Sequence, residues 1–178
     1  DALRNGELPN VFNPEFSGGS FMDINLYNIY FVMGLFGAPE RAKYYPNLHA
    51  GGIDTSGILI MEYPGFVCEC TGAKDTWGVN GVQIQGNEGF ILVPDAANSC
   101  REVRVVTKKE DRTCSIQEDT DRRTLEIRAV AEIIAAGDYG ECRRRMKKTL
   151  EVVRFLEETR KDAGILFAAD EGLYAVVN

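Results

Sequence analysis

The sequence is poor in the motifs that most readily indicate a chemistry. It has one histidine, His49, and five cysteines without a Cys-x-x-Cys pair, so we expect no zinc or other metal site. It contains neither G-x-G-x-x-G nor G-x-x-x-x-G-K-[ST], and therefore no nucleotide-phosphate loop of its own; G-x-S-x-G is missing as well. Nothing in the chain is a catalytic centre that a short motif alone would identify.

Positive charge and long apolar runs are also scarce. The formal net charge of −7 argues against nucleic acid as a partner, because phosphate binding needs a basic face. No run of about 18 apolar residues predicts a membrane span. An odd number of cysteines, none with metal-ligand spacing, indicates a reduced protein, and we expect a cytoplasmic location.

The length and composition predict one folded domain over residues 1–178. The chain has 44% hydrophobic and 26% charged residues, as ordinary globular proteins do. It opens with Asp1-Ala2-Leu3, which is neither a start methionine nor a signal peptide. We therefore expect a piece of a longer protein.

The hydrophobic periodicity changes twice along the chain. A polar, glycine-bearing approach leads into an apolar run that predicts a buried helix over residues 20–36. Turn residues then separate short β-type runs, which predict three hairpins. Helical spacing returns later and predicts two further helices. The expected hairpins cover 57–63 with 66–71, 81–86 with 89–93, and 102–107 with 113–116, and the two helices cover 122–136 and 140–162. This order predicts an α+β fold with a predominantly antiparallel open sheet and helices packed on one face.

A polar stripe on the first helix is the main candidate site. At about 100° per residue, Asp23 and Tyr27 lie about 40° apart, with Tyr30 and Gly34 on the same stripe. A carboxylate in an apolar helix is costly unless it is paired or used. One interpretation is a proton-handling pair at a pocket floor, and the other is a core helix whose aspartate is satisfied locally. The phenol would be a proton donor at neutral pH, and a nearby cation would be needed to make it a base.

Other candidates carry weaker signals. Trp77, in a polar loop, fits a pocket cover and an edge anchor about equally well. The basic run at 143–148 is interpreted as a solvated helix face. Cys68 and Cys70 are interpreted as small buried residues on one side of a strand.

Several motifs, taken in order, resemble the carboxy-terminal domain of the Gfo/Idh/MocA family of NAD(P)-dependent oxidoreductases. The family's hallmark there is a glycine-rich approach to Asp-x-Gly-x-His on a buried helix. The matching stretches are 16–27, ending in Asp23-Ile24-Asn25-Leu26-Tyr27; Leu35-Phe36-Gly37-Ala38-Pro39 at the helix end; the hairpin 83–91; and the closing segment 160–165. Asn25 replaces the usual glycine, and Tyr27 replaces the usual histidine. Branches similar to dihydrodiol dehydrogenases and glucose-fructose oxidoreductase carry tyrosine there.

The resemblance implies a role for each candidate residue and places cofactor binding in another domain. Tyr27 would move a substrate hydroxyl proton and Asp23 would orient a lysine or a substrate hydroxyl, with Tyr30, Gly19 and Trp77 lining the substrate site. The lysine and the Rossmann domain that binds NAD or NADP would lie upstream. This chain alone would then bind no cofactor and show no turnover.

Two further expectations concern partners. The substrate would be a small molecule: a sugar, a polyol or a related hydroxy or carbonyl compound. The run 58–63 is apolar on both faces of its strand, so we expect self-association through the free sheet face, a surface that is commonly an oligomer interface in the family. The alternative function is a non-catalytic ligand-sensing or oligomerisation module on the same scaffold.

Overall fold

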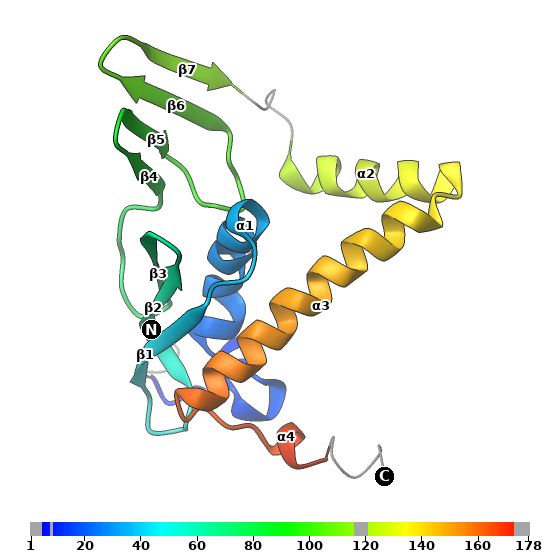
Figure 1. The fold of residues 1–178 in the computed structure, drawn as a ribbon. Coiled ribbons are helices and arrows are strands. Elements are labelled where there is room, and N and C mark those ends of the chain that lie inside the picture. Colours follow the sequence, from blue (N-terminus) through cyan, green and yellow to red (C-terminus); the bar gives the residue numbers. More distant parts are fainter. Residues whose placement is uncertain (1–4, 8, 116–120, 173–178) are drawn as a thin grey trace. The chain divides into compact units, whose positions relative to one another are not determined.

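In the computed structural model, which describes residues 5–7, 9–115 and 121–172, the chain has the predicted α+β character. The described residues form two open antiparallel sheets and several helices (Figure 1). The first four residues and Ile116, the expected last residue of the third hairpin, lie outside the described residues. The fold class predicted from periodicity is confirmed, but the strands divide between two sheets.

The chain falls into two compact units: residues 1–77 with 150–178, and residues 78–149. The first unit holds sheet β1-β2-β3, and the second holds sheet β4-β5-β6-β7. The strands are β1 Arg41–Leu48, β2 Asp54–Tyr63, β3 Phe66–Ala73, β4 Val82–Gly86, β5 Gly89–Val93, β6 Glu102–Thr107 and β7 Asp111–Ser115. All three predicted hairpins are present. Pro64-Gly65 and Asn87-Glu88 supply the turns of the first two, as their sequences indicated.

The helices also fall where the spacing placed them. They are α1 Leu26–Phe36, α2 Arg122–Ala136, α3 Tyr139–Asp162 and a short α4 Ala168–Gly172. Asp121 caps α2 through the backbone amide of Arg123, and Gly137 ends it in the left-handed conformation. The apolar stripe of α2 (Ile127, Val130 and Ile134) is exposed. The sequence therefore predicted this helix correctly without indicating what its apolar face contacts.

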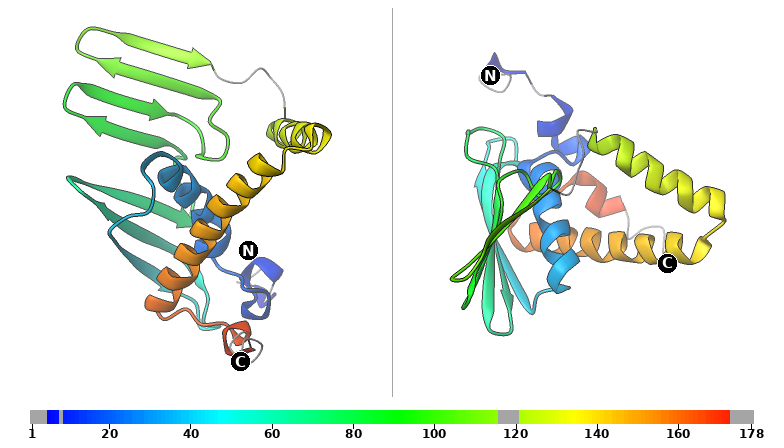
Figure 2. Two further views of the ribbon diagram at one scale, coloured as in Figure 1. Left: turned by 45° about the vertical axis from the view of Figure 1, so that its right-hand side comes forward. Right: turned by 90° about the horizontal axis from the view of Figure 1, so that it is seen from above.

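In the first unit, one face of the three-stranded sheet is covered and the other is open. Figure 2 shows α1 running along the covered face. Side chains from α1, β2 and the second half of α3 form the core between the sheet and α1. Each of the following is at most 1% exposed: Ile29, Leu59, Met61, Val152 and Leu156. On the open face Tyr45, Ile58 and Val67 are exposed, so the sheet retains an uncovered apolar surface.

A buried ion pair holds α4 against the end of α3. The Arg160 guanidinium donates two hydrogen bonds to the Asp170 carboxylate, at 2.5 and 2.7 Å, and lies over the Phe167 ring. Only 6% of the Arg160 side chain and 14% of the Asp170 side chain are exposed. The hydrogen bonds from Arg160 hold the pKa of Asp170 well below its usual range.

Candidate active site on the first helix

The helix that carries the candidate site is not a uniform α-helix. Residues Phe21–Asn25 form a π-helical turn, and α1 begins at Leu26. Asp23 lies inside this turn and Tyr27 lies just beyond it. A π-turn adds a residue to the helical repeat and is frequent at functional sites. The 40° separation expected from a uniform α-helix therefore does not apply here, a feature that hydrophobic spacing could not indicate.

A buried carboxylate from the sheet anchors the start of this helix. Asp54, at the beginning of β2, is 1% exposed and accepts hydrogen bonds from the Phe21 amide and from the Tyr44 hydroxyl, both at 2.7 Å. Burial raises the pKa of the Asp54 carboxyl more than these hydrogen bonds lower it. Burial, together with the neighbouring carboxylate, raises the pKa of the Tyr44 phenol well above its usual value. The pair fixes the helix start to the two strands.

Gly19 belongs to this anchor. It is buried with φ +134°, and an added Cβ would collide with the Asp54 carboxylate. Glycine is thus required here for the close approach of the loop to Asp54. The structure gives Gly19 this packing role, and its expected place in the substrate lining stays a prediction.

The carboxylate of Asp23 pairs with Lys74, the residue that follows β3. Only 10% of the Lys74 side chain is exposed, whereas 48% of the Asp23 side chain is. Sequence analysis missed this lysine, because 51 positions separate it from Asp23 and no local pattern joins a strand end to a helix. The pairing places a cation beside the candidate site within the chain itself.

The remaining members of the predicted stripe differ in their exposure. Tyr27 is 45% exposed, Tyr30 is partly buried against the core, and Gly34 is exposed with open space around it. Asn25 and Asn28 face the sheet, where Asn28 donates to the Asn25 amide oxygen and to the Thr71 carbonyl of β3. Two polar residues therefore hold the helix against the sheet and leave Tyr27 accessible.

Trp77 takes no part in this arrangement. Its side chain is fully exposed in the loop after β3, so the structure shows no contact that would make it line the site. Its assignment to the substrate site stays a prediction.

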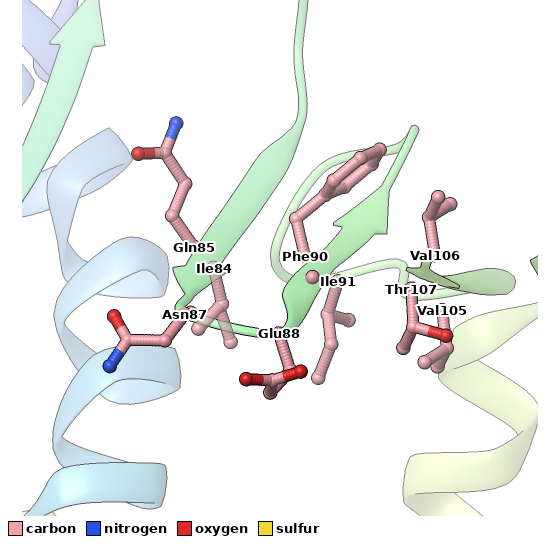
Figure 3. A pocket seen from close by; sticks show the side chains of 11 residues that line it. Ile84, Gln85, Asn87, Glu88, Phe90, Ile91, Val105, Val106 and Thr107 are labelled. Carbon is pink, nitrogen blue, oxygen red and sulfur yellow. The ribbon is translucent and has the colours of Figure 1, made fainter. Parts of the chain in front are cut away.

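The second unit has a hollow of about 360 Å³ on its sheet, built from β4, β5, β6 and the β4–β5 turn. Figure 3 shows its lining, which includes Ile84, Phe90, Ile91 and Val105. Glu88 is its one ionisable residue. An apolar hollow with a single carboxylate offers surface for contact but no pair of groups for acid–base chemistry.

The helix start at Phe21 does not offer its backbone amide to the phosphates of a dinucleotide. The one glycine-rich approach to a helix start, at Gly18 and Gly19, brings the Phe21 amide to the Asp54 carboxylate, so an anion already occupies this position. Within the described residues, no three His, Cys, Asp or Glu side chains gather to hold a metal ion. No helix among them is long and apolar enough to cross a membrane.

Comparison with known proteins identifies oxidoreductases. No family model matches the chain. It is 30% identical over 174 residues to scyllo-inositol 2-dehydrogenase (NADP(+)) IolU of Bacillus subtilis, covering 96% of this chain and 52% of that protein. It is 25% identical over 171 residues to trans-1,2-dihydrobenzene-1,2-diol dehydrogenase of Bos taurus, covering 87% and 49%. The chain spans about half the length of the curated relatives it matches.

A solved structure shows the same fold. The putative oxidoreductase yvaA of Bacillus subtilis matches with a TM-score of 0.60 at 15% identity, covering 85% of this chain and 52% of that one. The chain is therefore an α+β domain with the fold of the matching half of that protein. These relatives are dehydrogenases and oxidoreductases, each matched over about half of its length, which confirms the resemblance to the carboxy-terminal domain of the Gfo/Idh/MocA family that the motifs indicated.

Proposed function

We propose that this chain is the substrate-binding domain of an NAD(P)-dependent oxidoreductase and that Tyr27 is its acid–base residue. The observation that carries the proposal is the placement of Asp23 and Tyr27, four residues apart on the accessible side of a helix that Asp54 fixes to the sheet. A fixed helix with two accessible polar groups meets the geometric need of proton transfer, which depends on positioned groups.

In this proposal each residue has one role. Tyr27 takes the hydroxyl proton of a carbinol as it is oxidised, or returns it to a carbonyl oxygen as it is reduced. Asp23 accepts a hydrogen bond from a second substrate hydroxyl, a charge-assisted contact that orients the substrate. NAD or NADP, when bound, supplies the hydride acceptor or donor, and it would be held by a Rossmann domain outside this chain. Tyr30 would line the site.

The relatives support a substrate class. One is named for scyllo-inositol and the other for a dihydrobenzene diol. Both compounds are six-membered rings that carry hydroxyls on adjacent carbons. We therefore propose a ring-borne secondary alcohol with a neighbouring hydroxyl, from the sugars, polyols or related diols: one hydroxyl meets Tyr27 and the next meets Asp23.

Assembly and location complete the proposal. The open face of sheet β1-β2-β3 would join two copies, because Tyr45, Ile58 and Val67 leave apolar surface exposed there. The five cysteines are all unpaired, which fits the reducing cytoplasm.

The test is Tyr27→Phe in the full-length protein, assayed with NAD and NADP against a panel of inositols, sugars and cyclic diols. We expect kcat to fall by about 10²–10⁴-fold, the usual contribution of general acid–base catalysis, while cofactor binding is unchanged. Leu35→Ala, an exposed substitution on the same helix, is the control. The 178-residue chain alone should show no turnover. An unchanged kcat in Tyr27→Phe would overturn the role of Tyr27, and a full-length protein without turnover on any compound of the panel would favour a sensing or assembly module instead.

A further inference from the structure

Lys74 occupies a position that the sheet fixes firmly. It follows the last residue of β3, and its backbone amide donates to the Thr55 carbonyl at 2.8 Å, continuing the pairing of β2 with β3. The next residue, Asp75, is engaged separately, since it accepts a hydrogen bond from the Thr55 hydroxyl at 2.7 Å. The start of the Lys74 side chain is therefore held by the sheet.

The side chain of Lys74 is buried with its charge. Only 10% of it is exposed, and a buried ammonium is costly unless it is paired. Two groups compensate for this cost: the Asp23 carboxylate, and the Phe12 ring, whose centroid lies 5.4 Å from Nζ. Because Asp23 is the charged partner, each side chain fixes the other across the junction of helix and sheet.

The pair is asymmetric in its access to solvent. The lysine is enclosed, whereas about half of the Asp23 side chain is open. Lys74 donates to Oδ2 of Asp23, which leaves Oδ1 as the second acceptor atom of the carboxylate. A ligand can therefore reach the carboxylate while the cation stays behind it.

We propose that Lys74 is the positioning residue of this site, holding the Asp23 carboxylate in place and aiming its second oxygen at a substrate hydroxyl. This inference rests on the proposed function. Lys74 acts through Asp23 and does not contact the substrate. The cation that holds Asp23 thus comes from this chain, although the sequence resemblance implied a lysine upstream.

The experiment compares Lys74→Met, Lys74→Arg, Asp23→Asn and the double variant Lys74→Met/Asp23→Asn in the full-length protein. We expect Lys74→Met to lower kcat/KM about tenfold, the scale of one hydrogen bond to a charged group, mainly through KM. Lys74→Arg, which keeps the charge, should recover most of the loss. In the Asp23→Asn background, Lys74→Met should cause little further loss, because the group that it positions is gone.

Lys43→Met is the matched control. Lys43 also pairs with an aspartate, Asp162, at 3.3 Å, but both side chains are more than half exposed. Exposed pairs of this kind contribute little, so kcat/KM should change less than twofold.

A second measurement separates this inference from the proposed function. Urea unfolding of the same four variants gives the coupling between Lys74 and Asp23 without any turnover, and we expect about a tenfold coupling in the unfolding equilibrium constant. Independent losses on unfolding, or losses in kcat/KM that multiply, would overturn the role of Lys74. If the kcat of Tyr27→Phe is unchanged while the coupling between Lys74 and Asp23 on unfolding is intact, the proposed function alone is overturned.

Discussion

The hydrogen bond from the Tyr44 hydroxyl to the Asp54 carboxylate offers the sharpest test of how the site helix is held. The two oxygens are 2.7 Å apart, and both residues are 1% exposed. Tyr44→Phe removes only the hydroxyl, so packing of the ring is kept. A hydrogen bond to a charged group contributes about 1.5–3 kcal/mol, so above the raised pKa of Asp54 we expect the free energy of unfolding to fall by about 2 kcal/mol.

The assay is urea unfolding, with hydrogen exchange at the Phe21 amide as the local measurement. Because that amide donates to the same carboxylate, its protection should fall in Tyr44→Phe. In an Asp54→Asn background the acceptor is neutral, and the loss from Tyr44→Phe should shrink to about 1 kcal/mol. Tyr63→Phe is the control, since its hydroxyl donates to a neutral acceptor, the Gly37 carbonyl, at 2.8 Å. Equal losses in both backgrounds would refute the reasoning.

The Asp54 carboxylate also makes the free energy of unfolding depend on pH. The pKa of Asp54 is raised in the folded state above its unfolded value of about 3.9, so folding favours the protonated form. The stability that this group contributes is therefore fully present below about pH 4 and is lost as the pH rises through the raised value. Asp54→Asn removes this pH-dependent contribution. The unfolding free energy of the variant minus that of wild type should therefore increase between pH 4 and pH 8, because only wild type loses stability from this group. A constant difference would contradict this.

Two further predictions concern α4 and the open sheet face. Asp170→Asn should destabilise the protein by about 3 kcal/mol at pH 7, because it leaves the buried Arg160 guanidinium without its charged partner. The pKa of Asp170 is depressed in the folded state, so this contribution is present above the unfolded pKa of about 3.9 and is lost as the pH falls; urea midpoints for variant and wild type should converge in acid. Ile58→Glu should dissociate the proposed oligomer in sedimentation, whereas Val130→Glu, exposed on α2, should not; a monomeric wild type would refute the interface.

Hydrophobic periodicity determined much of this protein by itself. Alternating runs around Pro64-Gly65 and Asn87-Glu88 specified the hairpins, because period-two patterns and turn residues act within a few positions of each other. The spacing of Ile127, Val130 and Ile134 specified α2 for the same reason. Several motifs taken in order, including the one around Asp23 and Tyr27, indicated the resemblance to the family.

Tertiary structure decided what depends on distant positions. The strands from β1 to β7 form two sheets, and alternation along a strand says nothing about which strands share a sheet. The partners of the site helix lie far along the chain, with Lys74 against Asp23 and Asp54 against Phe21. Burial and pairing of charges depend on packing between elements. The sequence could therefore locate Asp23 and Tyr27, while only the folded chain could show how the helix that carries them is held.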